Sequence, residues 1–407
     1  MNIHDTKTAA FLAYKSILRG SRSTAVLLVF IISLSYLNIL FVSGMLFGLQ
    51  DLMVRSIINL FSAHVTISAQ QEPRVKAYIP DQNDLRAELE TIPGVIATSR
   101  HYLLAGSIGF DKLKNGVFKY ISGAIVAIHP EEEKNVLSLH TFLIDGEWLE
   151  PTDHDQIVLS SALAGGYGLF APSDLGGVRV GDKVRIVFAN EVSRPYTVKG
   201  IYNDAIGLFE TFITVEEAES ILSTHNEATQ ILVKADVETT SLETLVRRIE
   251  DVAPNLKIQP YTVLLGSFAA FLSALDLISA IVSVISVLVA AITMFVLIYV
   301  NAINKRRQIG ILKAIGIKSG IIVMSYLFQS LFYSICGVLI GYFFVFYILT
   351  PFMYANPIDV IFGYLSPVYS ETAIMAGIVS LLVASLLAGL IPAWLVARAA
   401  ILKSLSR

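Results

Sequence analysis

The chain alternates between long apolar stretches and one long stretch of ordinary polar composition. Four stretches contain no Asp, Glu, Lys or Arg: residues 24–50, 277–304, 319–358 and 372–397. Because a helix rises about 1.5 Å per residue, about 20 apolar residues cross the hydrocarbon layer of a bilayer. Each stretch is long enough to span that layer as a helix. The pattern predicts an integral membrane protein with one span, a large aqueous domain and then three further spans.

The polar stretch 51–265 has the pattern of an α+β domain. Period-two alternation and β-branched residues predict strands, at 64–68, 95–109, 117–128, 157–163, 183–188, 198–202, 212–215 and 230–237. Helical spacing and capping residues predict helices, at 81–91, 215–223 and 241–252, the last with Ser241 as its N-cap. The part between about 141 and 215 is predicted to be a β-rich insert. The expected fold class is a four-helix membrane protein with an α+β extracytoplasmic domain inserted between helices 1 and 2.

Both helices that flank this domain are predicted to extend beyond the membrane. Residues 45–61 continue the first span with apolar residues at helical spacing, interrupted by Asp51 and Arg55. A helical pattern resumes at Tyr261, and one unbroken helix over 262–303 would be about 60 Å long, twice the hydrocarbon thickness. We therefore expect a two-helix stalk beneath the domain, with Asp276 at the water interface.

The distribution of charge predicts which side of the membrane each segment faces. Residues 1–23, 304–318 and 398–407 together hold twelve basic residues and one acid, whereas residues 51–265 hold 18 basic and 29 acidic residues. Loops rich in Lys and Arg stay in the cytoplasm. The predicted order in the cell (inner or plasma) membrane is a cytoplasmic N-terminus (1–23), span one (24–50), an external domain (51–265), stalk and span two (266–303), a cytoplasmic segment (304–318), span three (319–350), an external loop (351–371), span four (372–397) and a cytoplasmic tail (398–407).

Two features concern export. The first apolar run follows a basic leader of 23 residues and lacks a small-x-small cleavage site, so we expect a retained anchor rather than a signal peptide. The single cysteine, Cys336, lies in the third span. The external domain must therefore be stabilised by its own core, without a disulfide.

The most informative short segment is residues 304–320, with the sequence NKRRQIGILKAIGIKSG. Ile309, Leu312, Ile315 and Ile317 form an apolar stripe opposite basic residues, which predicts a short amphipathic helix along the membrane. From the residues alone, two interpretations stay open. The helix contacts only lipid headgroups, or it binds a protein partner.

This segment resembles the permeases of the FtsX/MacB superfamily of ABC transporters. Their pattern is a basic pair, then Ile-Gly-x-Leu-Lys-Ala-Ile-Gly, then a span rich in Gln and Gly, which Gln329 and the pair Gly337 and Gly341 match. The C-terminal stretch 389–399 is similar to the closing motif of that family, although Ile401 stands where the family often has proline. The lipoprotein-releasing (LolC/LolE-type) branch is similar in the stretches 60–67 and 146–149 as well.

The resemblance implies that the helix over 305–318 is a coupling helix that docks on a separate ATPase. The implied contact surface combines basic, apolar and small residues: Arg306, Arg307, Ile309, Gly310, Lys313 and Gly316. The implied partners are a cytoplasmic ABC ATPase dimer, which carries the ATP and Mg²⁺, and a second permease subunit that is identical or paralogous. Gly337 and Gly341 are a small-xxx-small pair, for helix packing within the protomer or at a dimer seam.

The implied function is mechanotransmission, in which ATP hydrolysis in the cytoplasm drives work on an extracytoplasmic substrate. A lipoprotein or another lipidated molecule is the favoured substrate. The alternatives are a tripartite efflux permease with an external adaptor, and a signalling permease that controls a cell-wall hydrolase. A membrane-anchored binding protein is the alternative from another class.

Several chemistries are excluded by spacing. Glycine spacing around Gly316 does not fit a phosphate-binding loop, so no nucleotide site is expected in this chain and it is not expected to be an enzyme. His101, His129, His140 and His154 lack metal-ligand spacing, and the acids at 131–133 are interpreted as a solvated loop. No serine lies in a nucleophile elbow. Neither a metal site nor a nucleic-acid partner is expected.

Overall fold

The computed structural model describes most of the chain, namely residues 3–19, 22–70, 78–166, 174–204, 210–237, 239–360 and 363–398. The tail from 399 onward, including Ile401, lies outside the described residues. The chain divides into two compact units. The helical unit consists of Met1–Asp51, Ala270–Val360 and Tyr364–Arg407, and the sheet unit consists of Leu52–Ala269 with Ile361–Gly363.

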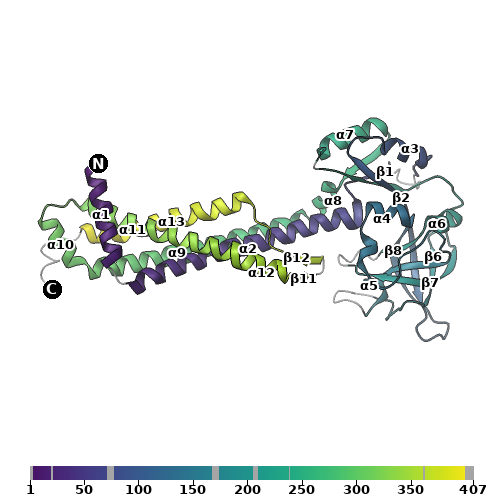
Figure 1. The fold of residues 1–407 in the computed structure, drawn as a ribbon. Helices are drawn as coiled ribbons and strands as arrows, with labels where there is room; N and C mark the ends of the chain where they lie inside the picture. The colour runs from purple at the N-terminus through teal and green to yellow at the C-terminus, as the bar shows by residue number, and fades with distance from the viewer. Residues whose placement is uncertain are drawn as a thin grey trace. The chain divides into compact units, whose positions relative to one another are not determined.

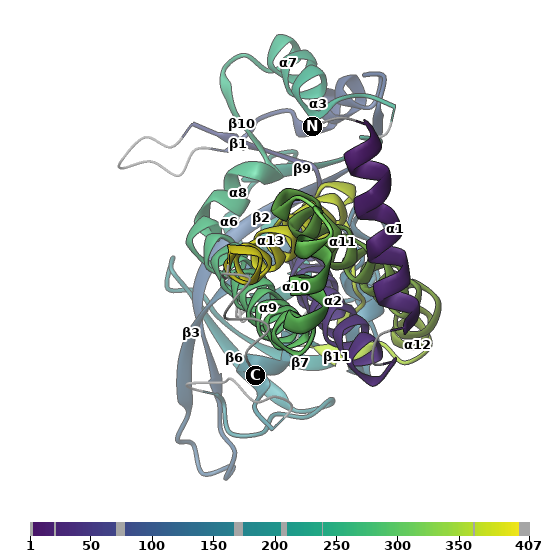
Figure 2. The same ribbon diagram turned by 90° about the vertical axis from the view of Figure 1, so that its left-hand side faces the viewer.

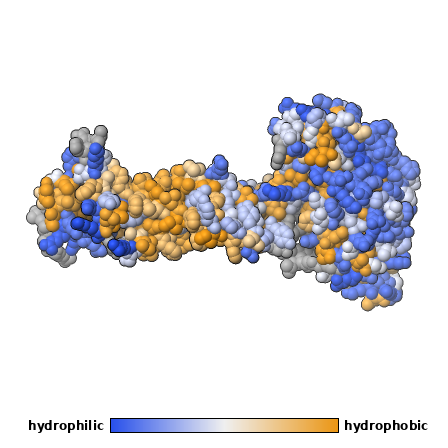
Figure 3. All heavy atoms as spheres, in the orientation of Figure 1, coloured by the Kyte–Doolittle hydropathy of each residue, from blue (hydrophilic) through white to orange (hydrophobic). Residues whose placement is uncertain are grey.

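Four long helices build the helical unit (Figure 1): α2 (Arg22–Ile57), α9 (Ala269–Asn304), α11 (Ser319–Phe344) and α13 (Glu371–Arg398). All four are long and apolar enough to cross a membrane, and apolar side chains cover them (Figure 3). Each uncharged stretch of the sequence falls largely within one of them. The chain is thus a membrane protein whose sheet unit lies, in sequence, mainly between the first and second apolar helices.

The first helix extends beyond its span as predicted, because α2 continues into the π-helix η1 (Ile58–Ser62). The end of the third helix differs from the predicted one. The third helix continues through η3 (Val345–Leu349) into α12 (Thr350–Ala355), so it enters the stretch predicted as an external loop. The rest of that stretch holds two short paired strands, β11 (Ile358–Val360) and β12 (Gly363–Leu365).

The prediction of one unbroken helix over 262–303 is wrong. Helix α8 (Tyr261–Ser267) ends at Phe268, whose ψ of 3° is not helical, and α9 begins at Ala269. The break follows directly after Gly266-Ser267, a pair that commonly marks kinks because glycine is a poor helix former. The sequence pattern of apolar residues did not detect it because both segments are apolar.

Two shorter helices complete the helical unit. Helix α1 (Ile3–Arg19) was not assigned from the sequence, and it packs along α11. Helix α10 (Arg306–Ala314) lies in the connection from α9 to α11, where an amphipathic helix was predicted. Figure 2 shows α1 and α10 together at one end of the bundle.

The strand pairings of the sheet unit close a ring of six strands. In order around the ring, these are β2 (Val95–Phe110), β3 (Lys119–Ile128), β8 (Glu210–Thr214), β5 (Gln156–Ser160), β7 (Ser193–Tyr202) and β6 (Lys183–Phe188), which pairs with β2 again. Strand β4 (Leu143–Gly146) adds to the free edge of β7. The strands of 141–215 are therefore not a separate insert. They need β2 and β3, from earlier in the chain, to complete a barrel.

The long strand β2 joins this barrel to an open sheet. Its first half pairs with β9 (Gln230–Ala235), which is followed by β1 (Val65–Ala69) and β10 (Leu256–Pro260). Helices α3 (Gln82–Leu89) and α7 (Leu242–Val252) contribute Leu89, Leu245 and Ile249 to the buried cluster of this sheet. Ser241 caps α7 by accepting a hydrogen bond from the Thr244 amide, as its sequence predicted.

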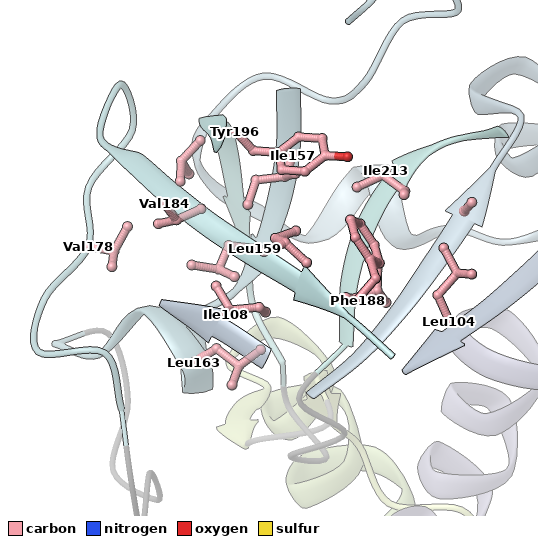
Figure 4. Packing of buried hydrophobic residues seen from close by; sticks show 14 of the residues in the cluster. Leu104, Ile108, Ile157, Leu159, Leu163, Val178, Val184, Phe188, Tyr196 and Ile213 are labelled. Carbon is pink, nitrogen blue, oxygen red and sulfur yellow. The ribbon is translucent and has the colours of Figure 1, made fainter. Parts of the chain in front are cut away.

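Apolar residues fill the barrel (Figure 4). Ile108, Leu159, Val184, Phe188 and Ile213 point into this interior from four different strands. A second cluster lies outside the barrel, where Trp148 packs against Phe212 with ring centroids 5.7 Å apart. Burial of aromatic and branched side chains of this kind is the main stabilising contribution in a domain without disulfides.

Three local elements depart from the predicted ones. Residues 130–136 form helix α4 (Pro130–Val136) rather than a solvated loop, because Pro130 takes the first helical position and three acids occupy the first turn. Strand β5 ends at Ser160, and residues 161–164 form the short helix α5 (Ser161–Ala164) instead. Helix α6 (Val215–Leu222) and the 3₁₀ turn η2 (Leu139–Phe142) complete the unit.

Candidate functional site

The candidate site of the helical unit is the segment that joins α9 to α11. Helix α10 ends with glycine in the left-handed region, at Gly316, whose φ is +97°. The Gly316 amide donates to the carbonyl of Lys313, and the Ile317 amide donates to the carbonyl of Leu312. This pair of hydrogen bonds is a Schellman motif, which stops the helix and turns the chain toward α11. A glycine at position 316 is therefore explained by the end of the helix itself, without a partner.

The six residues of the predicted contact surface differ in their exposure to solvent. Arg306, Arg307 and Gly316 are exposed, and Lys313 is partly exposed. Ile309 and Gly310 are buried within the chain. Ile309 belongs to the apolar cluster of the helical unit, together with residues of α9, α11 and α13. In this conformation the two buried residues hold α10 on its own bundle, and the basic residues are what the segment presents outward.

Helix α1 is part of this site, although the sequence interpretation did not include it. The Lys305 ammonium donates to Ser16 Oγ at 2.7 Å, and Ser16 Oγ donates to Gln329 Oε1 at 3.1 Å. Lys318 and Asp5 form a further ion pair at 3.8 Å. These contacts connect α1 to both ends of the α10 segment. The buried alanines of α1 at helical spacing, Ala9 and Ala13, were a sequence signal for its packed face.

The small-xxx-small pair of α11 packs within the chain. A Cβ on Gly341 would stand 2.8 Å from the backbone oxygen of Ser33 and 3.1 Å from Cδ1 of Tyr36, both on α2. Close approach of helix backbones is what such pairs allow. Of the two interpretations left open by the sequence, the structure shows packing within the protomer.

A second candidate site is a cavity of about 310 Å³ in the sheet unit. Apolar side chains supply much of its wall: Ile57, Phe61, Leu103, Leu264 and Phe268. Polar groups of β8 and β9 also reach it, namely Glu210 and Gln230. The volume is at the lower end of the range of small-molecule pockets, about 300 to 1,000 Å³. An apolar wall with a few polar groups suits a ligand with a hydrocarbon part.

Glu210 is the ionisable group of this cavity. Burial raises the pKa of its carboxyl from 4.5 to about 7, and the charges of Asp204 and Glu133 raise it further while His101 lowers it. Desolvation disfavours the carboxylate form, so the cavity wall carries a group that changes charge near neutral pH. No sequence pattern marked this carboxyl, because Glu210 begins strand β8 without any motif around it.

Beside the cavity lies a buried polar group that the sequence did not connect. His101 Nε2 lies 2.7 Å from Glu133 Oε2, which also accepts a hydrogen bond from Ser99 at 2.7 Å. The Gln230 amide lies 3.2 Å from the other ring nitrogen of His101. Glu133 is 1% exposed. Among the residues that the structure describes, no group of three or more His, Cys, Asp or Glu could hold a metal ion.

The four apolar helices are those of a polytopic membrane protein. Residues 280–401, which include α10, match the family of the FtsX-like permease C-terminal domain. This part of the chain is similar to the FtsX-like permeases. No curated protein matches the chain.

Three of the solved structures that are similar to this chain each match about half of it. The periplasmic region of MacB from Actinobacillus actinomycetemcomitans is 13% identical, with a TM-score of 0.36 over 50% of this chain and 92% of that one. The extracellular domain of the ABC-type transporter YknZ from Gram-positive bacteria is 14% identical, with a TM-score of 0.33 over 48% and 98%. A domain of a permease protein from Porphyromonas gingivalis is 16% identical, with a TM-score of 0.28 over 48% and 85%. At these scores the similarity carries no functional information.

Proposed function

We propose that this chain is the transmembrane subunit of an ABC transporter that couples ATP hydrolysis by a separate cytoplasmic ATPase to work on an extracytoplasmic substrate. The observation that carries the proposal is α10, a short helix with outward basic residues inside the segment that matches the FtsX-like family. Permeases of this superfamily work with ABC ATPases. We propose two permease subunits and two ATPases in the working assembly, with ATP and Mg²⁺ on the ATPases.

The proposed orientation places both termini and α10 in the cytoplasm and the sheet unit outside. The support is the excess of Lys and Arg in the segments at the α10 end of the spans, together with the acidic balance of residues 51–265. In this orientation movement of α10 is transmitted through α9 to the outside, because a packed helix shifts as a unit.

The proposed contact with the ATPase consists first of Arg306 and Arg307, which are exposed. An acidic groove on the partner would complement them. Ile309 and Gly310 would contribute by fixing α10 on the bundle.

The test is photocrosslinking from position 307 in the native membrane, followed by identification of the crosslinked protein. The expected product is an ABC ATPase, and Arg307→Glu should abolish its co-purification and the coupling of ATP hydrolysis. The matched control is Lys7→Glu, since Lys7 is an exposed basic residue of the neighbouring helix α1. Retention of the ATPase by Arg307→Glu, or its equal loss in Lys7→Glu, would refute the contact.

We propose a lipoprotein or another lipidated molecule as the substrate. The apolar wall of the cavity in the sheet unit supports this choice, since it offers a place for a hydrocarbon group outside the cytoplasm. Acylated protein should co-purify with the chain. The variant Leu264→Glu, which places a charge in that wall, should lower the amount of acylated protein that co-purifies. Co-purification of an external adaptor, with no acylated protein, would favour a tripartite efflux permease, and a cell-wall hydrolase would favour a signalling permease.

A further inference from the structure

A second cavity, of about 370 Å³, lies at the α10 end of the helical unit between α1, α10 and α11. Its lining does not include Arg306 or Arg307, the exposed basic pair of α10, and the cavity is open to solvent on one side. Three basic residues reach it: Lys15 and Arg19 from α1, and Lys305 from the start of α10. Nothing in the permease function described above uses this cavity.

The charge of the cavity is unbalanced. No acidic residue lines it among those that the structure describes. Asp5 is the one acid of the first 23 residues, and it forms an ion pair with Lys318 instead. Partial burial lowers the pKa of the Lys305 ammonium, since desolvation disfavours its charged form. An anion in the cavity would therefore complement three cations in a wall whose described residues include no carboxylate.

Uncharged polar groups extend the site inward. Ser16, Ser325, Tyr326 and Gln329 also line the cavity. The chain of hydrogen bonds from Lys305 to Ser16 and on to Gln329 fixes the Lys305 ammonium at this position. Hydroxyl and amide donors beside fixed cations are the groups that bind phosphate oxygens.

Apart from Gln308, the remaining wall is apolar, which distinguishes a lipid phosphate from a free one. Leu12, Ile309, Leu312 and Ile322 line the cavity beside its basic residues. The position is at the boundary of the spans, because α9 ends at Asn304 and α11 begins at Ser319. Basic pockets between spanning helices bind the headgroups of anionic lipids, whose acyl chains then lie on apolar surface.

We propose that this cavity binds the phosphate headgroup of an anionic phospholipid, with Lys15, Arg19 and Lys305 as its cationic ligands. The bound lipid would bridge α1, α10 and α11, and it would stabilise α10 on the bundle. The proposal does not depend on the ATPase partner or on the substrate, so it stands or falls separately from the proposed function.

The test is native mass spectrometry of the full chain released from nanodiscs that contain equal amounts of phosphatidylglycerol and phosphatidylcholine with the same acyl chains. Retained phosphatidylglycerol is expected. The triple variant Lys15→Gln, Arg19→Gln and Lys305→Gln should weaken this retention about 100-fold. The control triple, Lys7→Gln, Arg306→Gln and Arg307→Gln, removes the same charge from exposed positions outside the cavity and should retain the lipid.

A second variant covers the possibility that the triple does not fold. Gln308→Glu adds a negative charge at the cavity and leaves the bond of Lys305 to Ser16 in place. It should weaken retention about five-fold. Equal loss in the two triples, equal retention of both lipids, or displacement of phosphatidylglycerol by millimolar inorganic phosphate would each overturn the lipid assignment.

Discussion

A Cβ atom on Gly337 would stand 2.7 Å from the Cβ of Ile32, so α11 and α2 approach each other as closely as their backbones permit at this point. The backbone oxygen of Val29 would lie 3.1 Å from the same Cβ. The contact is therefore with the backbone of α2 as well as with a branched side chain that has little freedom to move. A glycine pair that the sequence left open as a dimer seam is used in the packing of the chain itself.

The first prediction follows from this contact. Gly337→Leu should lower the thermal stability of the helical unit, by about 3 kcal/mol or more, because the new side chain overlaps α2. Gly320→Leu on the same helix is the control, since nothing lies within 4 Å of a Cβ there. Thermal unfolding in detergent compares the two. If Gly337→Leu left the melting temperature unchanged but altered the oligomeric state, the glycine pair would instead lie at a dimer interface.

The sequence predicted what depends on local pattern. The four spans follow from apolar stretches, and the cap at Ser241 and the close helix approach at Gly337 follow from single residue types. The sequence did not predict which helix or strand each element would pack against or pair with. The barrel depends on β2 pairing with β6, some 80 positions further along the chain, and alternation along one strand carries no information about its partner.

The candidate sites show the same limit. The basic pair Arg306 and Arg307 could be recognised from the sequence, because charges next to an apolar stripe define a surface. The burial of Ile309 and Gly310, and the role of α1, depend on packing between helices that are distant in sequence. Likewise His101 and Glu133 have no shared motif, and only the fold of β2 against α4 brings them together.

The second prediction concerns the end of α10. Gly316→Ala should weaken the Schellman motif by about 1 kcal/mol, because an alanine at positive φ is strained. Hydrogen exchange of the Gly316 and Ile317 amides, which close the motif, should become about five-fold faster. Gly320→Ala, a few residues further on, should not change their exchange. Unchanged exchange in Gly316→Ala would show that Gly316 does not stabilise the end of α10.

The third prediction concerns the buried pair of His101 and Glu133. Glu133→Ala should destabilise the sheet unit by about 3–5 kcal/mol, because it leaves Ser99 and His101 buried without their acceptor. Glu131→Ala on the same helix removes a carboxylate whose side chain is 60% exposed and should change stability by less than about 0.5 kcal/mol. Urea unfolding followed by Trp148 fluorescence, in a Trp394→Phe background, measures both. Equal effects of the two variants would contradict a stabilising role of the pair.

The fourth prediction concerns Glu210 and pH. Its pKa is raised to about 7 in the folded unit, so the folded state keeps a proton that the unfolded chain loses above its usual value of 4.5. Between pH 4.5 and about 7, the folded state therefore binds more protons than the unfolded state. The contribution of Glu210 to the free energy of unfolding falls as pH rises through this interval. Below the interval both states are protonated, and above it both are ionised, so the contribution is constant there.

Glu210→Gln should remove this part of the pH dependence, because its amide stays neutral. Relative to wild type, the variant should gain up to about 3 kcal/mol between pH 5 and pH 8, an upper limit because the side chain is partly exposed to the cavity. The measurement is urea unfolding followed by Trp148 fluorescence at both pH values, since Trp148 packs against Phe212 of the same strand. Glu216→Gln is the control, an exposed acid of α6 that should keep the wild-type dependence. If Glu210→Gln and wild type lose stability in parallel from pH 5 to pH 8, the carboxyl of Glu210 titrates at its ordinary value and the cavity wall is already charged at neutral pH.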